Sequence, residues 1–81
     1  MTRQIISDGT VGKALDVLDI VMAFGRAVRF SEIVEAAPYP KATLHRLLQT
    51  LTSQGLLAYD EDRQVYVAGM RLVRIGRHAW N

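Results

Sequence analysis

The chain has 81 residues, of which 49% are hydrophobic, and a formal net charge of +2. This length allows one domain with one modest core, and the composition is that of neither a disordered nor a fibrous protein. The chain contains no cysteine, which excludes disulfides and thiolate chemistry and is compatible with a reducing cytoplasm. No run approaches the roughly 18 to 20 apolar residues that cross a bilayer, and residues 1–9 lack the apolar segment of a signal peptide.

Residues 1–10 show no periodicity, and we expect them to form a flexible N-terminal arm. Thr10 is a plausible N-cap for a first helix that runs from about residue 11 to 24 and ends at Gly25. Its apolar arc is wider than one small core needs, so either the helix is deeply embedded or part of the arc packs against a second subunit. The candidates for such a contact are Val17, Ile20, Val21 and Phe24. Residues 26–30 could add a short edge strand.

Residues 31–37 predict a second, shorter helix, with Ser31 as a good N-cap. Pro38 ends this helix because the residue before a proline is pushed out of the α region. Pro40 suits the first turn of the next helix, where its missing N–H costs nothing. No short polar side chain precedes the amides that follow, so they are left either for a phosphate or for water.

Residues 40–54 predict a third helix with two unlike faces. At about 100° per residue, one stripe is apolar, formed by Leu44, Leu47, Leu48 and Leu51. The opposite side carries Arg46, Gln49, Thr50 and Ser53. A short helix, a turn and a longer helix with polar donors near its start are the layout of a helix-turn-helix.

Residues 56–59 and 65–68 are short β-prone runs, which predict an antiparallel hairpin. A hairpin after a recognition helix makes a wing. Residues 70–80 return to helical spacing and predict a fourth helix. From residue 63 to the end there are four arginines and no acid, at Arg63, Arg71, Arg74 and Arg77. A basic end favours a polyanionic partner.

The sequence holds no catalytic pattern. It has no glycine-rich phosphate loop and no paired histidine or glutamate–histidine spacing for a metal. His45 and His78 lie far apart and on different predicted helices, and the acidic run at residues 60–62 is read as a solvated turn. We therefore predict no enzyme, no cofactor and no metal site.

At this point the chain resembles a known family. Residues 11–79 are similar to the N-terminal DNA-binding domain of the IclR (isocitrate lyase regulator) family of bacterial transcription factors. The similarity covers GKALDVL at 12–18, FSEI at 30–33, PKATLHRLLQTL at 40–51, GLL at 55–57 and YVAG at 66–69. The block at the third helix is the most specific of these. The Pro38-Tyr39-Pro40 turn departs from the Gly-Leu-Pro turn usual in the family.

The resemblance implies a mainly α fold with a small β-hairpin, a winged helix-turn-helix. It implies a DNA-binding domain at residues 11–69 and a linker helix at 70–81 towards an effector-binding domain absent from this chain. A small-molecule effector would act only through that domain. The expected partners are double-stranded DNA, as a palindromic operator, and further copies, as a dimer or a full-length tetramer. The regulator would repress or activate transcription in the bacterial cytoplasm, on the nucleoid.

Charge and geometry then predict the contacts. Phosphates would be held by the amides that open the third helix and by the side chains of Ser31, Lys41, Thr43 and His45. Arg46 would pair with guanine and Gln49 with adenine in the major groove. Thr50 lies on the same surface, and Arg63 is the basic residue of an otherwise acidic wing. The alternative is a winged helix that binds only proteins, and Lys41, His45 and Arg46 argue against the uncharged surface it requires.

Overall fold

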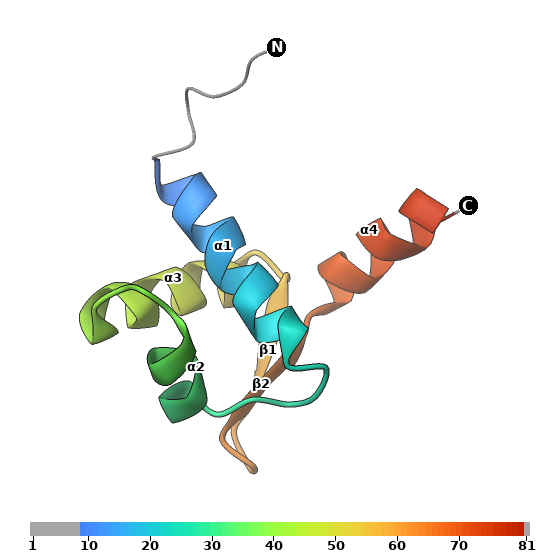
Figure 1. The fold of residues 1–81 in the computed structure, drawn as a ribbon. Helices are drawn as coiled ribbons and strands as arrows, with labels where there is room; N and C mark the ends of the chain where they lie inside the picture. The colour runs from blue at the N-terminus through green and yellow to red at the C-terminus, as the bar shows by residue number, and fades with distance from the viewer. Residues whose placement is uncertain (1–8, 81) are drawn as a thin grey trace.

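The computed structural model describes residues 9–80, which form four α-helices and a two-stranded antiparallel sheet (Figure 1). In chain order the elements are α1 (Thr10–Ala23), α2 (Phe30–Ala36), α3 (Lys41–Ser53), β1 (Leu57–Asp60), β2 (Val65–Ala68) and α4 (Met70–Trp80). This order confirms the predicted winged helix-turn-helix. The expected N-terminal arm falls on residues that, apart from 9 and 10, lie outside the described part.

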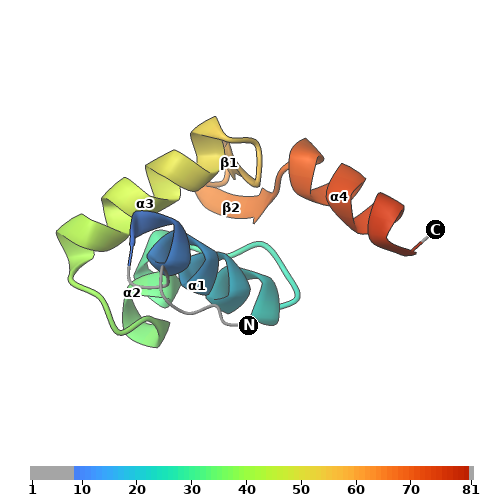
Figure 2. The ribbon, with the colours of Figure 1, turned by 90° about the horizontal axis from the view of Figure 1, so that it is seen from above.

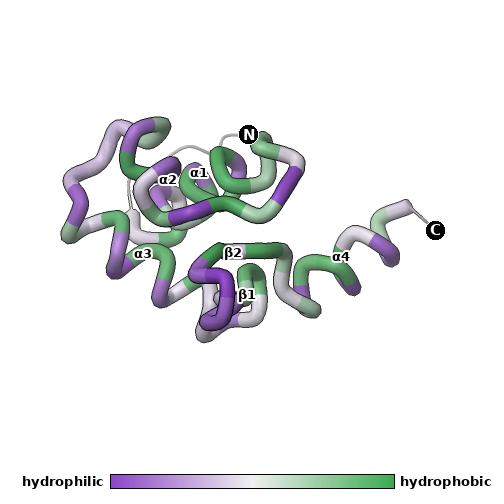
Figure 3. Tube along the Cα trace, turned by 90° about the horizontal axis from the view of Figure 1, so that it is seen from below, coloured by the Kyte–Doolittle hydropathy of each residue, from purple (hydrophilic) through white to green (hydrophobic). Residues whose placement is uncertain are grey.

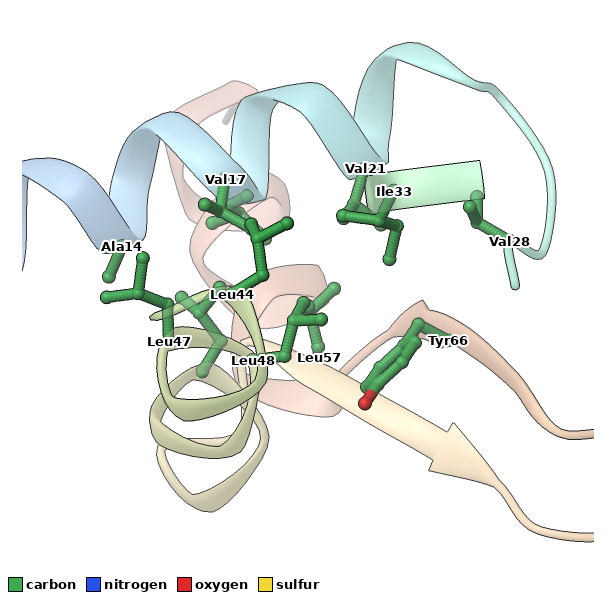
Figure 4. Close-up of a cluster of buried hydrophobic side chains, with 12 residues drawn as sticks. Ala14, Val17, Val21, Val28, Ile33, Leu44, Leu47, Leu48, Leu57 and Tyr66 are labelled. Atoms are coloured by element: carbon green, nitrogen blue, oxygen red, sulfur yellow. The ribbon is translucent and has the colours of Figure 1, made fainter. Parts of the chain in front are cut away.

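The core lies where α1 crosses α3, and α2 and the hairpin close it (Figure 4). The predicted leucine stripe of α3 is buried along its whole length, with Leu44 and Leu48 at 0% exposure. Burial of one such side chain stabilises the fold by roughly 1.5 to 3 kcal/mol. Because this stripe fixes the rotation of α3 about its own axis, the polar side of the helix must face outward.

On α1 the structure corrects two of the four residues predicted for a contact with a second subunit. Val17 and Val21 are 0% and 1% exposed and belong to the core of their own chain, so neither can reach another copy. The apolar side chains that α1 leaves outside are Val11, Leu15 and Met22. The other two residues expected in that contact, Ile20 and Phe24, are half-buried and line a surface hollow with Ala23 and Ala36, so a contact there stays a prediction.

Two predicted N-caps are wrong. Thr10 is the first residue of α1, and Gly9 holds the cap position, with its carbonyl accepting from the N–H of Lys13 at 3.2 Å. Ser31 lies inside the first turn of α2 because that helix begins one residue earlier, after Arg29. At α1 no side-chain cap is present, and at α2 the Glu32 carboxylate accepts from the main-chain N–H of Arg29 at 3.0 Å, so neither predicted hydroxyl caps a helix.

Pro40 likewise precedes α3 instead of opening its first turn. It holds the cap position, and its carbonyl accepts from the N–H of Leu44 at 2.9 Å. The edge strand expected at residues 26–30 is reduced to a single bridge. There Val28 and Tyr66 exchange both main-chain hydrogen bonds, at 3.1 and 2.7 Å. Gly25 follows α1 with φ of 67°, as expected of a glycine at a helix end.

The hairpin pairs Leu57 with Ala68 through to Asp60 with Val65. Its turn is the strongly hydrophilic tip in Figure 3, where the Asp60 carboxylate accepts from the N–H groups of Asp62 and Arg63 at 3.1 and 3.2 Å. Beyond the hairpin, α4 leads away from the rest of the domain (Figure 2). No helix within residues 9–80 is long and apolar enough to span a membrane.

Candidate nucleic-acid interface

The outer face of α3, on the side opposite the core, is polar and exposed. At 100° per residue, Arg46 and Gln49 point within about 30° of the direction directly away from the buried leucines. Both side chains are exposed, as is Lys41 at the start of the helix. Neither of the ion pairs found within residues 9–80 involves Lys41 or Arg46. These cations are therefore free to meet an anion from outside.

The start of α3 offers main-chain donors as well. The residue at its cap position is Pro40, which supplies no side-chain hydrogen bond to the first turn. The first main-chain N–H group of α3 that donates a hydrogen bond within the chain is that of Leu44. The N–H groups of residues 41–43 therefore point out of the positive end of the helix, beside the ammonium group of Lys41.

The turn that leads into α3 is attached to α1 through Tyr39. Its hydroxyl donates to Oδ2 of Asp16 at 3.1 Å, and its ring packs against the core cluster. Burial, and after it the hydrogen bond to Asp16, raise the pKa of Tyr39 above its usual range, which favours the neutral hydroxyl that donates to Asp16. This contact links the turn before α3 to α1.

His45 lies on the flank of α3 that faces the hairpin. Its ring meets the edge of Phe30 with centroids 6.0 Å apart and the planes at 85°. Beyond this pair, a hollow runs between α3 and the wing, and it is lined by Phe30, His45, Gln49, Thr52, Ser53, Tyr59 and Tyr66. The rings of Tyr59 and Tyr66 lie across the two strands with centroids 4.8 Å apart and planes tilted by 56°. The interface is therefore a polar ridge beside an aromatic groove.

The groove contains residues that the sequence did not single out. Phe30 was read as part of the entry to the second helix, and Tyr59 and Tyr66 as strand residues. Tyr59 is 41% exposed, whereas Tyr66 beside it is 9% exposed and belongs to the core. The one signal in the sequence was a tyrosine on each predicted strand, and only the register of the hairpin brings the two side by side.

The other predicted residues of α3 lie towards α1. Thr50 lines a small apolar hollow with Val11 and Leu15, and its hydroxyl donates to the carbonyl of Arg46 at 3.1 Å. Thr43 is half-buried on the same flank. The structure thus brings Lys41, His45, Arg46 and Gln49 onto one surface and turns Thr43 and Thr50 to its edge.

Ser31 is exposed in the first turn of α2, next to a strong ion pair. The guanidinium of Arg26 donates two hydrogen bonds to the Glu32 carboxylate, at 2.7 and 3.1 Å. Those bonds, followed by a third from the N–H of Arg29, lower the pKa of Glu32 from 4.5 to about 2. Glu32 is therefore an anion at any physiological pH, and Arg26 partly neutralises its charge beside Ser31.

Arg63 is exposed at the wing, and its Nε lies 3.3 Å from Oδ2 of Asp60. The basic residue that the sequence predicted to contact DNA from the wing therefore already forms an ion pair with an acidic residue of the same turn. Within residues 9–80 no cluster of three or more metal-ligating side chains occurs.

The comparisons agree with this geometry. A model of the IclR helix-turn-helix domain matches residues 10–61. HmgR from Pseudomonas aeruginosa superimposes with a TM-score of 0.80 and 26% identity, over 86% of this chain and 29% of that one. An IclR transcriptional regulator from Alicyclobacillus acidocaldarius superimposes with a TM-score of 0.76 and 29% identity, over 95% of this chain and 30% of that one. An IclR-family regulator from Brucella abortus superimposes with a TM-score of 0.74 and 26% identity, over 94% of this chain and 28% of that one.

The chain thus spans less than a third of the length of each of these proteins. No curated protein sequence matches it. The family match covers well over half of the chain, including the whole of α1, α2 and α3 and the first strand of the wing. These findings identify a helix-turn-helix of DNA-binding transcriptional regulators and not an enzyme. The chain belongs to the IclR family of transcriptional regulators.

Proposed function

We propose that this domain binds double-stranded DNA in a sequence-specific manner, with α3 as the recognition helix in the major groove. The observation that carries the proposal is the outer face of α3, where Arg46 and Gln49 stand exposed opposite a buried leucine stripe, with Lys41 exposed at the start of the helix. A major groove about 12 Å wide admits one helix, and only side chains on the outer face of that helix can reach the base edges.

The residues divide into two roles. Lys41, His45 and the free amides at the start of α3 anchor phosphates and so fix the register of the helix, because phosphate contacts position without specifying sequence. Arg46 pairs with the O6 and N7 acceptors of guanine, and Gln49 pairs with N6 and N7 of adenine. Both have side chains long enough to reach into the groove from the ridge.

The remaining predicted contacts are peripheral in this proposal. Thr43 and Thr50 contact the DNA backbone from the side of α3 that faces α1. Ser31 adds a phosphate contact from the start of α2. Arg63 reaches the backbone only by leaving Asp60, from which its Nε is 3.3 Å away. An exposed pair of this kind contributes about 0.2 to 1 kcal/mol, so a phosphate can displace the carboxylate.

In the full-length regulator, α4 is the linker to an effector-binding domain that receives a small molecule. Two copies read a palindromic operator in the cytoplasm, on the nucleoid, because one domain of this size reads only a short half-site. The full-length protein represses or activates transcription as a dimer or a tetramer.

Selection of bound duplexes from a random DNA pool tests the proposal. We expect wild-type protein to enrich one half-site that contains guanine and adenine, and the Arg46→Ala variant to lose preference at the guanine. Titration on a palindrome against a single half-site then measures pairing on DNA. Failure to enrich any sequence, with binding retained to protein partners, would favour a winged helix used as a protein-interaction module.

A further inference from the structure

The hollow between α3 and the hairpin contains a buried hydroxyl that the chain itself does not satisfy. Tyr66 lines this hollow and is 9% exposed. Its ring belongs to the core cluster, and its hydroxyl oxygen points away from Val21 and Val28 (Figure 4). Within residues 9–80 this hydroxyl forms no hydrogen bond. Because buried polar groups nearly always have a partner, this one should take its partner from outside the chain.

The hydroxyl is held in a fixed place. The main chain of Tyr66 exchanges both hydrogen bonds with Val28, at 3.1 and 2.7 Å, and on its other side it pairs with Tyr59 of β1. The two tyrosine rings lie with their centroids 4.8 Å apart. Burial, and after it the neighbouring Tyr59, raise the pKa of Tyr66 above its usual range, which favours the neutral hydroxyl. Tyr66 therefore offers a preorganised donor in the wall of the hollow.

The other side chains of the hollow indicate which chemistry fits it. The hydroxyls of Thr52 and Ser53 already donate to carbonyls of α3, at 2.8 and 3.0 Å. The side chains of His45, Gln49 and the two tyrosines can all donate, and none of them forms a hydrogen bond in the described part of the chain. None of the described residues that line the hollow is acidic. Donors beside aromatic rings suit a ligand that combines anionic oxygens with an apolar part, as a sugar–phosphate chain does.

The hollow lies where a DNA strand passes when α3 enters the major groove. A helix with its side chains is about 10 to 12 Å across and the groove is about 12 Å wide, so the two strands that border the groove run along the two flanks of the helix. One flank of α3 faces α1, and the other faces the hairpin across the hollow. The hairpin tip is a poor contact for the second strand, because residues 60–62 are acidic and Arg63 is paired with Asp60. The contact should therefore fall further in, at the hollow.

We propose that the hollow holds one phosphate of the DNA strand on the hairpin side of α3. The hydroxyl of Tyr66 donates to an oxygen of that phosphate, and the ring of Tyr59 packs against the adjoining deoxyribose. This contact rests on the proposed function and adds to it two residues that carry no charge. The ring of Tyr66 belongs to the core, and its one oxygen atom binds the ligand. Because phosphate contacts position the protein without reading bases, Tyr66 fixes the register of α3 and not its sequence preference.

Tyr66→Phe tests the contact, because it removes the hydroxyl oxygen and keeps the ring in the core. We expect the variant to bind the selected half-site roughly tenfold more weakly, since a hydrogen bond to a charged acceptor is lost. Its melting temperature should stay the same or rise, because the fold loses a buried polar atom that has no partner within it. Thr52→Val is the matched control. It removes a hydroxyl of the same hollow that already donates to the carbonyl of Leu48 at 2.8 Å, so DNA affinity should not change.

Modified DNA identifies the partner of the hydroxyl. Methylphosphonate replaces one phosphate of the half-site at a time, which removes its charge and leaves the bases intact. At one position this replacement should weaken binding of the wild type and weaken binding of Tyr66→Phe much less, because both changes remove the same hydrogen bond. The slope of log affinity against log salt should be the same for both proteins, since a neutral hydroxyl displaces no counterion. A variant with a merely weakened fold would instead lose affinity equally on every duplex.

Three results would overturn the proposal. One is a Tyr66→Phe variant that binds the half-site as tightly as the wild type. The second is a loss of affinity together with a clear fall in melting temperature, which would make the hydroxyl a structural group. The third is an equal effect of methylphosphonate on both proteins at every position. Each of these leaves the proposed function standing, whereas a wild type that selects no DNA sequence would overturn the proposed function itself.

Discussion

At the scale of single residues, substitution of Arg46 should affect DNA recognition without affecting folding. Its side chain is exposed and makes no ion pair within residues 9–80, so its removal costs the fold nothing that the structure records. We expect Arg46→Ala to weaken specific DNA binding by about 1 to 3 kcal/mol without a change in melting temperature. Lys13→Ala, which removes the same charge from an exposed position on α1, is the matched control. A large fall in melting temperature without a loss of affinity would show that the polar face of α3 is misassigned.

Glu32 is a carboxylate whose protonation in acid should lower the stability of the domain. The pKa of Glu32 in the folded state is about 2, below its ordinary 4.5, because the hydrogen bonds from Arg26 and Arg29 favour the charged form. A depressed pKa stabilises the fold above pH 4.5, and that stabilisation is lost as pH falls from 4.5 to about 2.

Unfolding midpoints of wild type and Glu32→Gln, measured from pH 7 to pH 2, test this linkage. We expect the variant to be less stable above pH 4.5 and the difference to shrink towards pH 2, where the wild-type carboxylate is also neutral. Glu35→Gln removes the same charge from α2 and leaves the Arg26 pair intact. A difference that stays constant over this range would contradict the assignment.

At the scale of elements, the junction between α3 and α4 depends on a close main-chain approach. A Cβ at Gly69 would run into the carbonyl of Gly55, whose oxygen accepts the N–H of Arg71 at 3.0 Å, whereas a Cβ at Gly76 meets nothing within 4 Å. Gly69→Ala should therefore destabilise the domain by about 1 to 3 kcal/mol through overpacking. Gly76→Ala should stabilise it by about 0.5 to 1 kcal/mol, because alanine is the better residue inside a helix. Denaturant unfolding of both variants measures the contrast, and equal effects would contradict it.

The elements also show how far the sequence can be read. The leucines at helical spacing predict both α3 and its outer face, because a helix that buries one side must expose the opposite side. The caps were misread because both helices begin earlier than the nearest hydroxyl suggested: Gly9 holds the cap position of α1 and Arg29 that of α2, so Thr10 and Ser31 lie inside the first turn. On α1 the periodicity identified an apolar arc, but which half is covered depends on where α3 crosses it. For that reason Val17 and Val21 were placed at the surface and Leu15 was not distinguished from them.

At the scale of the whole molecule, the net charge of +2 is a poor measure of the attraction to a polyanion, because the acidic and basic residues lie on separate parts of the surface. The acids of the wing lie in one turn, whereas the start of α3 presents Lys41 and free amides. If each copy neutralises about four phosphates, log affinity should fall against log salt with a slope of about −3.6. Titrations by fluorescence anisotropy between low and physiological salt measure this slope. An affinity that does not change with salt would exclude backbone-anchored binding.

The central claim is that Arg46 on α3 reads guanine in the major groove. The most direct test replaces that guanine of the selected half-site by 7-deazaguanine, which removes the N7 acceptor and leaves base pairing intact. We predict that this replacement weakens binding of the wild type by about 1 kcal/mol or more, roughly fivefold or greater, and that it leaves binding of Arg46→Ala unchanged. If every guanine in the site can be replaced without loss for the wild type, or with equal loss for both proteins, α3 does not read the groove through Arg46.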